Sequence, residues 1–222
     1  PADDLIIPNE SSTEIDTSDT EANNLDLSTY LDELTVLVDI KNGGYGSGFF
    51  VDKDLILTNS HNVWETNNNE IYVSNKKIGR YIRAELVFKT PKYSDSEFGK
   101  RDYAILKLID YTDGPVPKFT NFKKRMQSVY AAGYPGAIIE QNPNAEIPES
   151  VITVGRILQI QNNQFAIEQV LHQASIAPGN SGGPLVDECG RIIGINSFLR
   201  PEQNLDSDFL DSFIKFFIIS LW

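Results

Sequence analysis

The chain is built from short runs of β-branched and aromatic residues, which Gly, Asn, Asp and Pro interrupt at intervals of about ten residues from Leu34 onward. Such runs are typical of β-strands joined by turns. Segments with a sustained 3.6-residue hydrophobic period are scarce, and short helical turns are expected only near residues 27–34 and 207–213. The 222 residues, 41% of them hydrophobic, suffice for one large all-β domain or two small ones.

The predicted strands form two sets of six, separated by a stretch from Asp113 to Arg125 that contains prolines and lysines. The first set covers residues 35–41, 47–52, 55–58, 71–74, 81–88 and 103–109, and the second covers residues 128–132, 151–160, 165–174, 183–186, 191–197 and 213–219. This arrangement predicts two six-stranded antiparallel β-barrels packed side by side, although sandwiches fit the same pattern. We therefore expect an N-terminal barrel over residues 29–125 and a C-terminal barrel over residues 126–222.

Charge is distributed unevenly along the chain. Eleven Asp or Glu and no Lys or Arg precede Lys41, whereas the rest carries 20 acids (31 − 11) against 19 bases. Residues 1–28 are too polar to offset the entropy of ordering, so we expect an acidic flexible tail there. Nucleic acid and anionic membrane surfaces would repel this segment, which argues against nucleic acid as a partner.

Cysteine content and hydropathy add two limits. The single cysteine, Cys189, excludes an intramolecular disulfide, so the fold must be stabilised by its hydrophobic core. The most apolar stretch, residues 213–222, is shorter than the roughly 20 residues of a membrane helix and contains Lys215. We therefore expect no membrane insertion.

The segment from Ala177 to Leu185 carries the most chemical information, because glycines lie on both sides of Ser181. Glycine permits the tight turn that would expose a serine hydroxyl. The amide N–H groups of Gly179 and Ser181 could then be the preorganised donors of an oxyanion hole. Taken alone, the same residues could also form a glycine-rich hairpin with an incidental serine.

A serine hydroxyl becomes an effective nucleophile only with a base in hydrogen-bond reach, and the chain contains two histidines. His61 follows a predicted strand at a turn, whereas His172 lies inside a predicted strand and is expected to be a packed residue. Asp102 immediately precedes an apolar strand, where its carboxylate can turn inward and orient the base. We therefore predict Ser181 as nucleophile, His61 as general base and Asp102 as the partner of His61. In isolation, a surface histidine and a strand-capping aspartate fit these positions too.

The sequence contains T-N-S-H, D-Y-A-I-L-K-L and P-G-N-S-G-G-P-L in this order, with the reactive positions 41 and 79 residues apart. Together these motifs resemble the trypsin-like serine proteases, most closely the bacterial HtrA (Deg) and glutamyl-endopeptidase branches. The likeness extends over about residues 35–197 and includes G-S-G-F-F-V before the histidine and G-R-I-I-G-I-N after the serine. It implies a double β-barrel, a catalytic cleft between the barrels and peptide-bond hydrolysis through an acyl-enzyme. That scheme requires protein or peptide substrates and no metal or organic cofactor.

Two departures from the digestive members of this family concern activation. Asn62 stands where those relatives have a cysteine after the histidine, in keeping with the absence of disulfides. Asn180 stands where they have an aspartate that pairs with a newly cut N-terminus and orders the oxyanion loop. A neutral amide cannot form that ion pair, so we do not expect activation by this switch. As in the HtrA-like branch, the loop would be competent already or be ordered by an effector.

The resemblance also indicates the primary specificity pocket. Ser175 and Ile176 would form its base and wall, and Asn196, Ser197 and Phe198 its other side. None of these residues is acidic, which disfavours a basic P1 residue because a buried cation would lack a counter-charge. The glutamyl-specific relatives have a histidine at the position of Asn196, so an acidic P1 residue is disfavoured too. We therefore expect a small or medium apolar P1 residue.

Two other functions were weighed. The residues around Ser181 also satisfy the G-x-S-x-G pattern of lipases and esterases, but no histidine follows the serine and no βα alternation is present. The second alternative is a trypsin-fold binding module or effector with little or no turnover. The family and the absence of an initial methionine favour a secreted or periplasmic location. No feature of the sequence indicates an oligomeric state.

Overall fold

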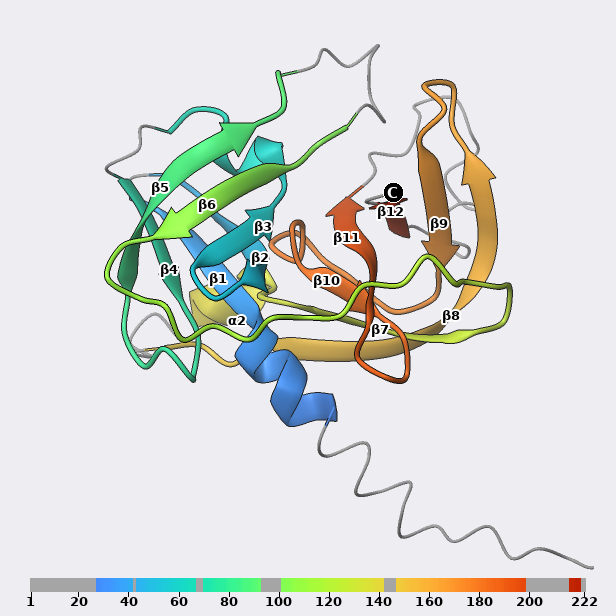
Figure 1. The fold of residues 1–222 in the computed structure, drawn as a ribbon, viewed down its shortest axis with the longest axis horizontal. Helices are drawn as coiled ribbons and strands as arrows, with labels where there is room; N and C mark the ends of the chain where they lie inside the picture. Colours follow the sequence, from blue (N-terminus) through green and yellow to red (C-terminus); the bar gives the residue numbers. More distant parts are fainter. Residues whose placement is uncertain are drawn as a thin grey trace, which may run out of the picture.

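The computed structural model describes residues 27–41, 43–66, 70–92, 101–141, 147–198 and 216–220. Within these ranges, twelve strands form two closed six-stranded barrels (Figure 1). This confirms the predicted all-β double-barrel fold over the sandwich alternative. All twelve predicted strands are present, with ends that differ by at most three residues. Most of the expected tail, residues 1–26, and the expected helical turn at 207–213 lie outside the described residues.

The first barrel holds the strands that come first in the chain, in the spatial order β1-β2-β3-β6-β5-β4. They are β1 (Thr35–Ile40), β2 (Tyr45–Asp52), β3 (Leu55–Thr58), β4 (Ile71–Ser74), β5 (Ile82–Lys89) and β6 (Ala104–Leu108). Strand β4 pairs back with β1, which closes the barrel. Burial alternates along β6, where Ala104, Leu106 and Leu108 point inward, as expected for a strand with one solvent-facing side.

The second barrel repeats this arrangement with the order β10-β11-β12-β9-β8-β7. Its strands are β7 (Ser128–Gly133), β8 (Val151–Asn162), β9 (Glu168–His172), β10 (Pro184–Val186), β11 (Ile192–Phe198) and β12 (Phe216–Ser220). Strand β9 begins later than predicted, because Asn163 accepts hydrogen bonds from the amides of Phe165 and Ile167 and holds a turn there. The expected domain limits at residues 28 and 125 stay predictions.

Three short helical segments accompany the strands in the described residues. The first, over residues 27–34, agrees with the expected helical turn near the N-terminus. The other two, the 3-10 helix η1 (Ser60–Val63) and the helix α2 (Gly136–Gln141), are too short to show a hydrophobic period and were not predicted. None of the described helices is long and apolar enough to cross a membrane.

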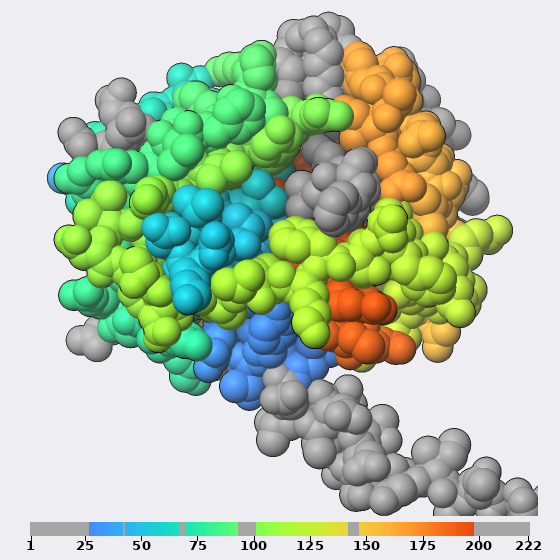
Figure 2. All heavy atoms as spheres, in the orientation of Figure 1, coloured from blue at the N-terminus to red at the C-terminus, as the bar shows by residue number. Residues whose placement is uncertain are grey.

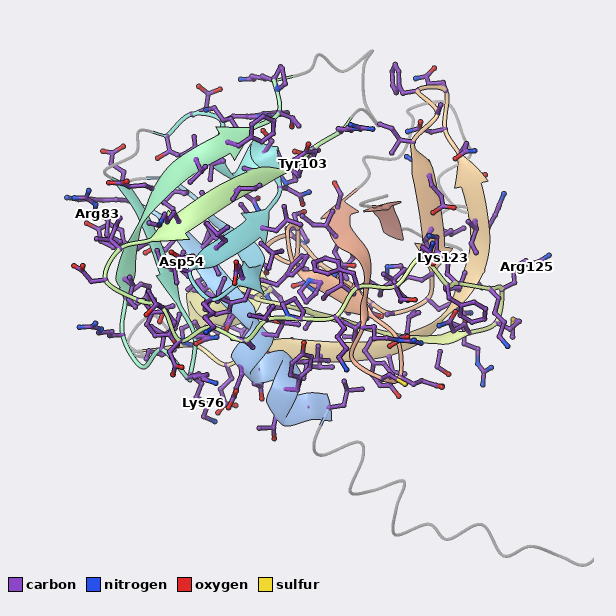
Figure 3. The ribbon with its side chains drawn as sticks, in the orientation of Figure 1. Asp54, Lys76, Arg83, Tyr103, Lys123 and Arg125 are labelled. Atoms are coloured by element: carbon purple, nitrogen blue, oxygen red, sulfur yellow. The ribbon has the colours of Figure 1, made fainter. Side chains whose placement is uncertain are left out.

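The two barrels share packing and are joined by a well-anchored connector. Ala132, Val186 and Ile195 of the second barrel belong to the same buried cluster as the core of the first. The connector runs across the front of both barrels (Figure 2) and exchanges backbone hydrogen bonds of 2.8 and 2.9 Å with Ile192. Lys123, labelled in Figure 3, has its side chain only 6% exposed and lies 2.5 Å from Glu168 of β9. The two barrels therefore share one buried apolar cluster, and polar contacts hold the connector to the second barrel.

Asn75, at the end of β4, ties the N-terminal helix to the first barrel. Its fully buried side chain donates to the carbonyl oxygens of Glu33 (2.8 Å) and Thr35 (3.1 Å) and accepts from the amide of Ile78 (2.8 Å). The carbonyl groups at the end of a helix have no partner within the helix. Asn75 supplies one, and it also holds the β4-β5 turn.

Replacing Asn75 by alanine should therefore destabilise the fold. Buried backbone groups left without partners cost about 1–3 kcal/mol each, and we expect the free energy of unfolding of Asn75→Ala to fall by about 3 kcal/mol. Urea denaturation measures this. Asn121→Ala, at an exposed position of the connector, should change the free energy by less than about 0.5 kcal/mol. Equal stabilities of the two variants would contradict the role of Asn75.

Candidate active site

His61 and Asp102 form a closely coupled pair in the first barrel. His61 lies on η1, directly after β3, and Asp102 lies just before β6, the strand that pairs with β3. The pairing of β3 with β6 therefore brings the two residues together. The Nδ1 atom of His61 is 2.6 Å from Oδ2 of Asp102, and the His61 amide donates to Oδ1 over 3.0 Å.

Burial and a further hydrogen bond hold this pair in place. Asp102 is 1% exposed, whereas the side chain of His61 is 30% exposed. Asn59 donates from Nδ2 to the Asp102 carbonyl oxygen over 2.7 Å, and the ring of Trp64 meets the imidazole edge-on, with centroids 6.2 Å apart. A carboxylate on Nδ1 directs the lone pair of neutral histidine to Nε2 and would stabilise the imidazolium.

Ser181 lies in a turn that leads into β10. Gly179 and Gly182 on either side have φ of +99° and +92°, a region that L side chains rarely adopt. A Cβ at Gly179 would lie 2.4 Å from the Tyr134 carbonyl oxygen, and one at Gly182 would lie 2.1 Å from that of Ser47. Both positions therefore require glycine, for backbone conformation and for space.

The peptides before Ser181 have a defined orientation. The carbonyl oxygen of Pro178 accepts from the amide of Gly136 at the start of α2 over 2.9 Å, and that of Asn180 accepts from Gly183 over 3.0 Å. In a planar trans peptide the N–H points opposite to the carbonyl, so the amides of Gly179 and Ser181 point away from these donors. No hydrogen bond between described residues occupies either N–H. Both predicted oxyanion donors are therefore available.

The peptide after Ser181 is held by both barrels. Its carbonyl oxygen accepts from the Ser47 amide of β2 and from Nδ2 of Asn62, each over 2.9 Å. Its N–H, which belongs to Gly182, donates to the Asn196 carbonyl oxygen of β11 over 2.8 Å. Ser181 thus sits at the junction of the barrels, beside the turn that carries His61.

The side chains of Ser181 and His61 do not themselves form a hydrogen bond among those the structure contains. Ser181 is 5% exposed, and Asn62, the residue after His61, donates to the Ser181 carbonyl oxygen. Hydrogen bonds between nucleophile and base are often long before substrate binds. The three predicted residues therefore meet in one place, with the His61–Asp102 bond formed and the Ser181–His61 bond open.

The residues predicted for the specificity pocket lie in the second barrel, and they differ in accessibility. Ser175 is exposed, and its carbonyl oxygen accepts from Thr153 over 2.7 Å, while Ile176 packs in the second hydrophobic cluster. Asn196 is fully buried and donates from Nδ2 to the Pro184 carbonyl oxygen over 2.9 Å. Ser197 and Phe198 follow it at the end of β11.

His172 is a packed residue of β9, as its place in a predicted strand suggested. It is fully buried, and burial lowers its pKa to about 3, with the side chain of Asn196 acting in the opposite direction. A histidine that stays neutral at this depth is unsuited to bind an acidic side chain by charge.

Two contributions to the site were not predicted. The first is Ser47, whose hydroxyl donates to the Gly179 carbonyl oxygen over 2.7 Å and accepts from the Tyr134 amide over 2.8 Å. The second is a cavity of about 410 Å³ beside His61, lined by residues that include Ile40, Tyr45 and Glu70. The sequence around Ser47 does not indicate its hydrogen bond to Gly179, because the two residues lie 132 residues apart along the chain.

The fold and this site define a trypsin-like peptidase domain, and the chain belongs to that family, whose sequence profile matches residues 46–195. Among curated proteins, it is 34% identical over 155 residues to the serine protease HTRA4 of Mus musculus, which covers 68% of this chain and 29% of that protein. It is 29% identical over 164 residues to the serine protease Do-like HtrB of Bacillus subtilis, which covers 70% of this chain and 32% of the relative. The chain thus spans about a third of the length of these relatives.

Solved structures show the same fold. The inactive form of the Rv3671c protease matches with a TM-score of 0.64 at 20% identity, over 90% of this chain and 89% of that chain. The active form of Rv3671c from M. tuberculosis matches with a TM-score of 0.63 at 19% identity, over 98% and 90% of the two chains. At this identity the likeness supports the architecture alone.

The buried His172 predicts a component of acid sensitivity. Its pKa of about 3 in the fold lies below the ordinary value of about 6.5, so below pH 6.5 the unfolded chain binds a proton that the folded chain does not. Its contribution is therefore complete above pH 6.5 and is lost, by up to roughly 1.4 kcal/mol per pH unit, as the pH falls towards 3.

Urea denaturation of the wild type and of His172→Leu between pH 7 and pH 4.5 tests this expectation. The variant should lose stability less steeply than the wild type over this range, because one proton fewer is taken up on unfolding. Asn121→Ala serves as the control and should follow the wild type. Parallel curves for His172→Leu and the wild type would show that the histidine is not kept neutral by the fold.

Proposed function

We propose that this protein is a serine endopeptidase that cleaves peptide bonds through Ser181, His61 and Asp102. The observation that carries the proposal is the 2.6 Å bond between His61 and Asp102 beside a turn in which the amides of Gly179 and Ser181 donate to no other described residue. Base, orienting carboxylate and oxyanion donors are the parts that acyl transfer requires. The relatives described above are named serine proteases, which supports the same reaction class.

The reaction begins when Oγ of Ser181 attacks the scissile carbonyl carbon and Nε2 of His61 takes the hydroxyl proton. Asp102 stabilises the imidazolium, and the amides of Gly179 and Ser181 donate to the oxyanion. Collapse breaks the C–N bond, and His61 gives its proton to the leaving amine. His61 then takes a proton from a water molecule that attacks the acyl carbon, and it returns this proton to Oγ of Ser181 as the ester C–O bond breaks and the second product leaves. The cavity beside His61 provides room for substrate next to the base.

A fluorophosphonate probe tests whether Ser181 is activated. Wild-type protein should be labelled covalently at one site, which peptide mass spectrometry should assign to Ser181, and Ser181→Ala should not be labelled. The reaction requires a deprotonating base and oxyanion donors, so a binding module of the same fold would not react. Absence of labelling in folded wild-type protein would favour that alternative over the enzyme.

Asp102→Asn tests the role of the buried carboxylate. An amide at this position would hold the wrong tautomer of His61, and we expect kcat to fall by roughly 10³- to 10⁴-fold with KM little changed. Asp110→Asn, at an exposed turn after β6, is the matched control and should leave kcat unchanged. A loss of less than tenfold in Asp102→Asn would remove Asp102 from the mechanism.

The preferred substrate has a small or medium apolar P1 residue. Support comes from the residues assigned to the pocket, none of which carries a charge, and from His172, which contacts the pocket residue Asn196 but is fully buried and has a lowered pKa. Cleavage of a peptide library should show Ala, Val or Leu before the scissile bond at least tenfold more often than Lys, Arg, Asp or Glu. A dominant charged P1 residue would contradict the assignment.

Export from the cytoplasm is part of the proposal. A relative from Pseudomonas fluorescens, 30% identical over 156 residues, is named a probable periplasmic serine endoprotease. Cell fractionation of the native host, with an antibody to this chain, tests this location.

A further inference from the structure

The turn that carries Ser181 is held by side chains of the first barrel, and these contacts have a role beyond stability. Asn62 donates from Nδ2 both to the Ser181 carbonyl oxygen (2.9 Å) and to Thr58 Oγ1 (3.0 Å). Ser47 donates its hydroxyl to the Gly179 carbonyl oxygen over 2.7 Å. The two residues therefore fix carbonyl groups on either side of Asn180.

Asn62 also occupies a particular place in space. An added Cβ at Gly46 of β2 would lie 2.4–2.7 Å from three atoms of the Asn62 carboxamide. Asn62 follows His61 directly, so its side chain joins the turn of the base to β2 and, through the Ser181 carbonyl, to the turn of the nucleophile. The Asn62 carboxamide thus links the turn of His61 to the turn of Ser181, together with the Ser47 amide, which donates to the same carbonyl oxygen.

Ordering of the turn in this way needs no charged partner. Asn180 is 2% exposed and neutral, and the peptides around it are oriented by Gly136, Ser47 and Asn62. Each of these donors belongs to the folded barrels.

We propose that Asn62 and Ser47 are positioning residues that hold the oxyanion turn and the His61 turn in register. By its hydrogen bonds, Asn62 holds the turn of His61 against β2, as a covalent link between positions 46 and 62 would. This inference rests on the proposed function, because the register matters only if Ser181 and His61 exchange a proton.

The first test is kinetic. Asn62→Ala should lower kcat for an apolar P1 peptide by roughly tenfold, the equivalent of one hydrogen bond, and should leave KM within twofold. The rate of fluorophosphonate labelling should fall in the same proportion, because acylation depends on the same alignment. Asn121→Ala is the control and should match the wild type. Unchanged kcat and labelling rate in folded Asn62→Ala would overturn the proposal.

The second test replaces the hydrogen bonds by a bond that can be opened. The double variant Gly46→Cys with Asn62→Cys, made in a Cys189→Ser background, brings two thiols together where the carboxamide now lies. The oxidised form should have a kcat within threefold of the wild type, and reduction by dithiothreitol should lower it by roughly tenfold, as in Asn62→Ala. If kcat of the oxidised form is no higher than that of the reduced form, the proposal is overturned. This test does not depend on the folding of Asn62→Ala.

Amide hydrogen exchange separates this inference from the proposed function. The Gly182 N–H, bound to the Asn196 carbonyl oxygen, should exchange faster in Asn62→Ala whether or not the protein turns over substrate. If the wild type is inactive but Gly182 exchanges faster in Asn62→Ala, the enzyme is refuted and the role of Asn62 in ordering the turn is retained. If the wild type is active but Gly182 exchanges at the same rate in Asn62→Ala as in the wild type, the enzyme is retained and the role of Asn62 is refuted.

Discussion

The peptide between Ser181 and Gly182 is the point on which the site depends. The first barrel donates two hydrogen bonds to its carbonyl oxygen, and the second barrel accepts one from its N–H. The peptide before Ser181 is held as well, because its Asn180 carbonyl oxygen accepts from the Gly183 amide, and two oriented planar peptides fix the backbone at Ser181 and the starting direction of its side chain. The barrels thus share one rigid unit, and a shift of either would move the serine relative to His61.

Apolar packing and hydrogen bonds both act at this junction, and they have different effects. Apolar packing that includes Ala132 and Val186 of the second barrel brings the barrels together without directional preference. Hydrogen bonds from Ser47 and Asn62 then select one arrangement, because a buried carbonyl without a donor is costly. With one cysteine in the chain, this combination takes the place of covalent cross-links.

Much of the architecture was predictable, because strand formation leaves a local record in the sequence. Short runs of β-branched and aromatic residues and the turn residues between them predicted all twelve strands, and three motifs in a fixed order indicated the family. The short helices η1 and α2 left no such record, since six residues or fewer cannot show a helical period. The partners of Ser47 were hidden too, because they are backbone atoms far away in the chain.

The sequence by itself determined which chemical groups are present: a serine between glycines, one histidine at a turn and an aspartate before a strand. It also placed glycine at positions 179 and 182, the two positions beside Ser181 at which the structure has a positive φ. The sequence predicted a packed His172 and a pairing of His61 with Asp102, but only the tertiary structure shows that burial lowers the pKa of His172 to about 3 and that Nδ1 of His61 lies 2.6 Å from Asp102. Burial and hydrogen-bond direction depend on strands distant in sequence that become neighbours only when both barrels close.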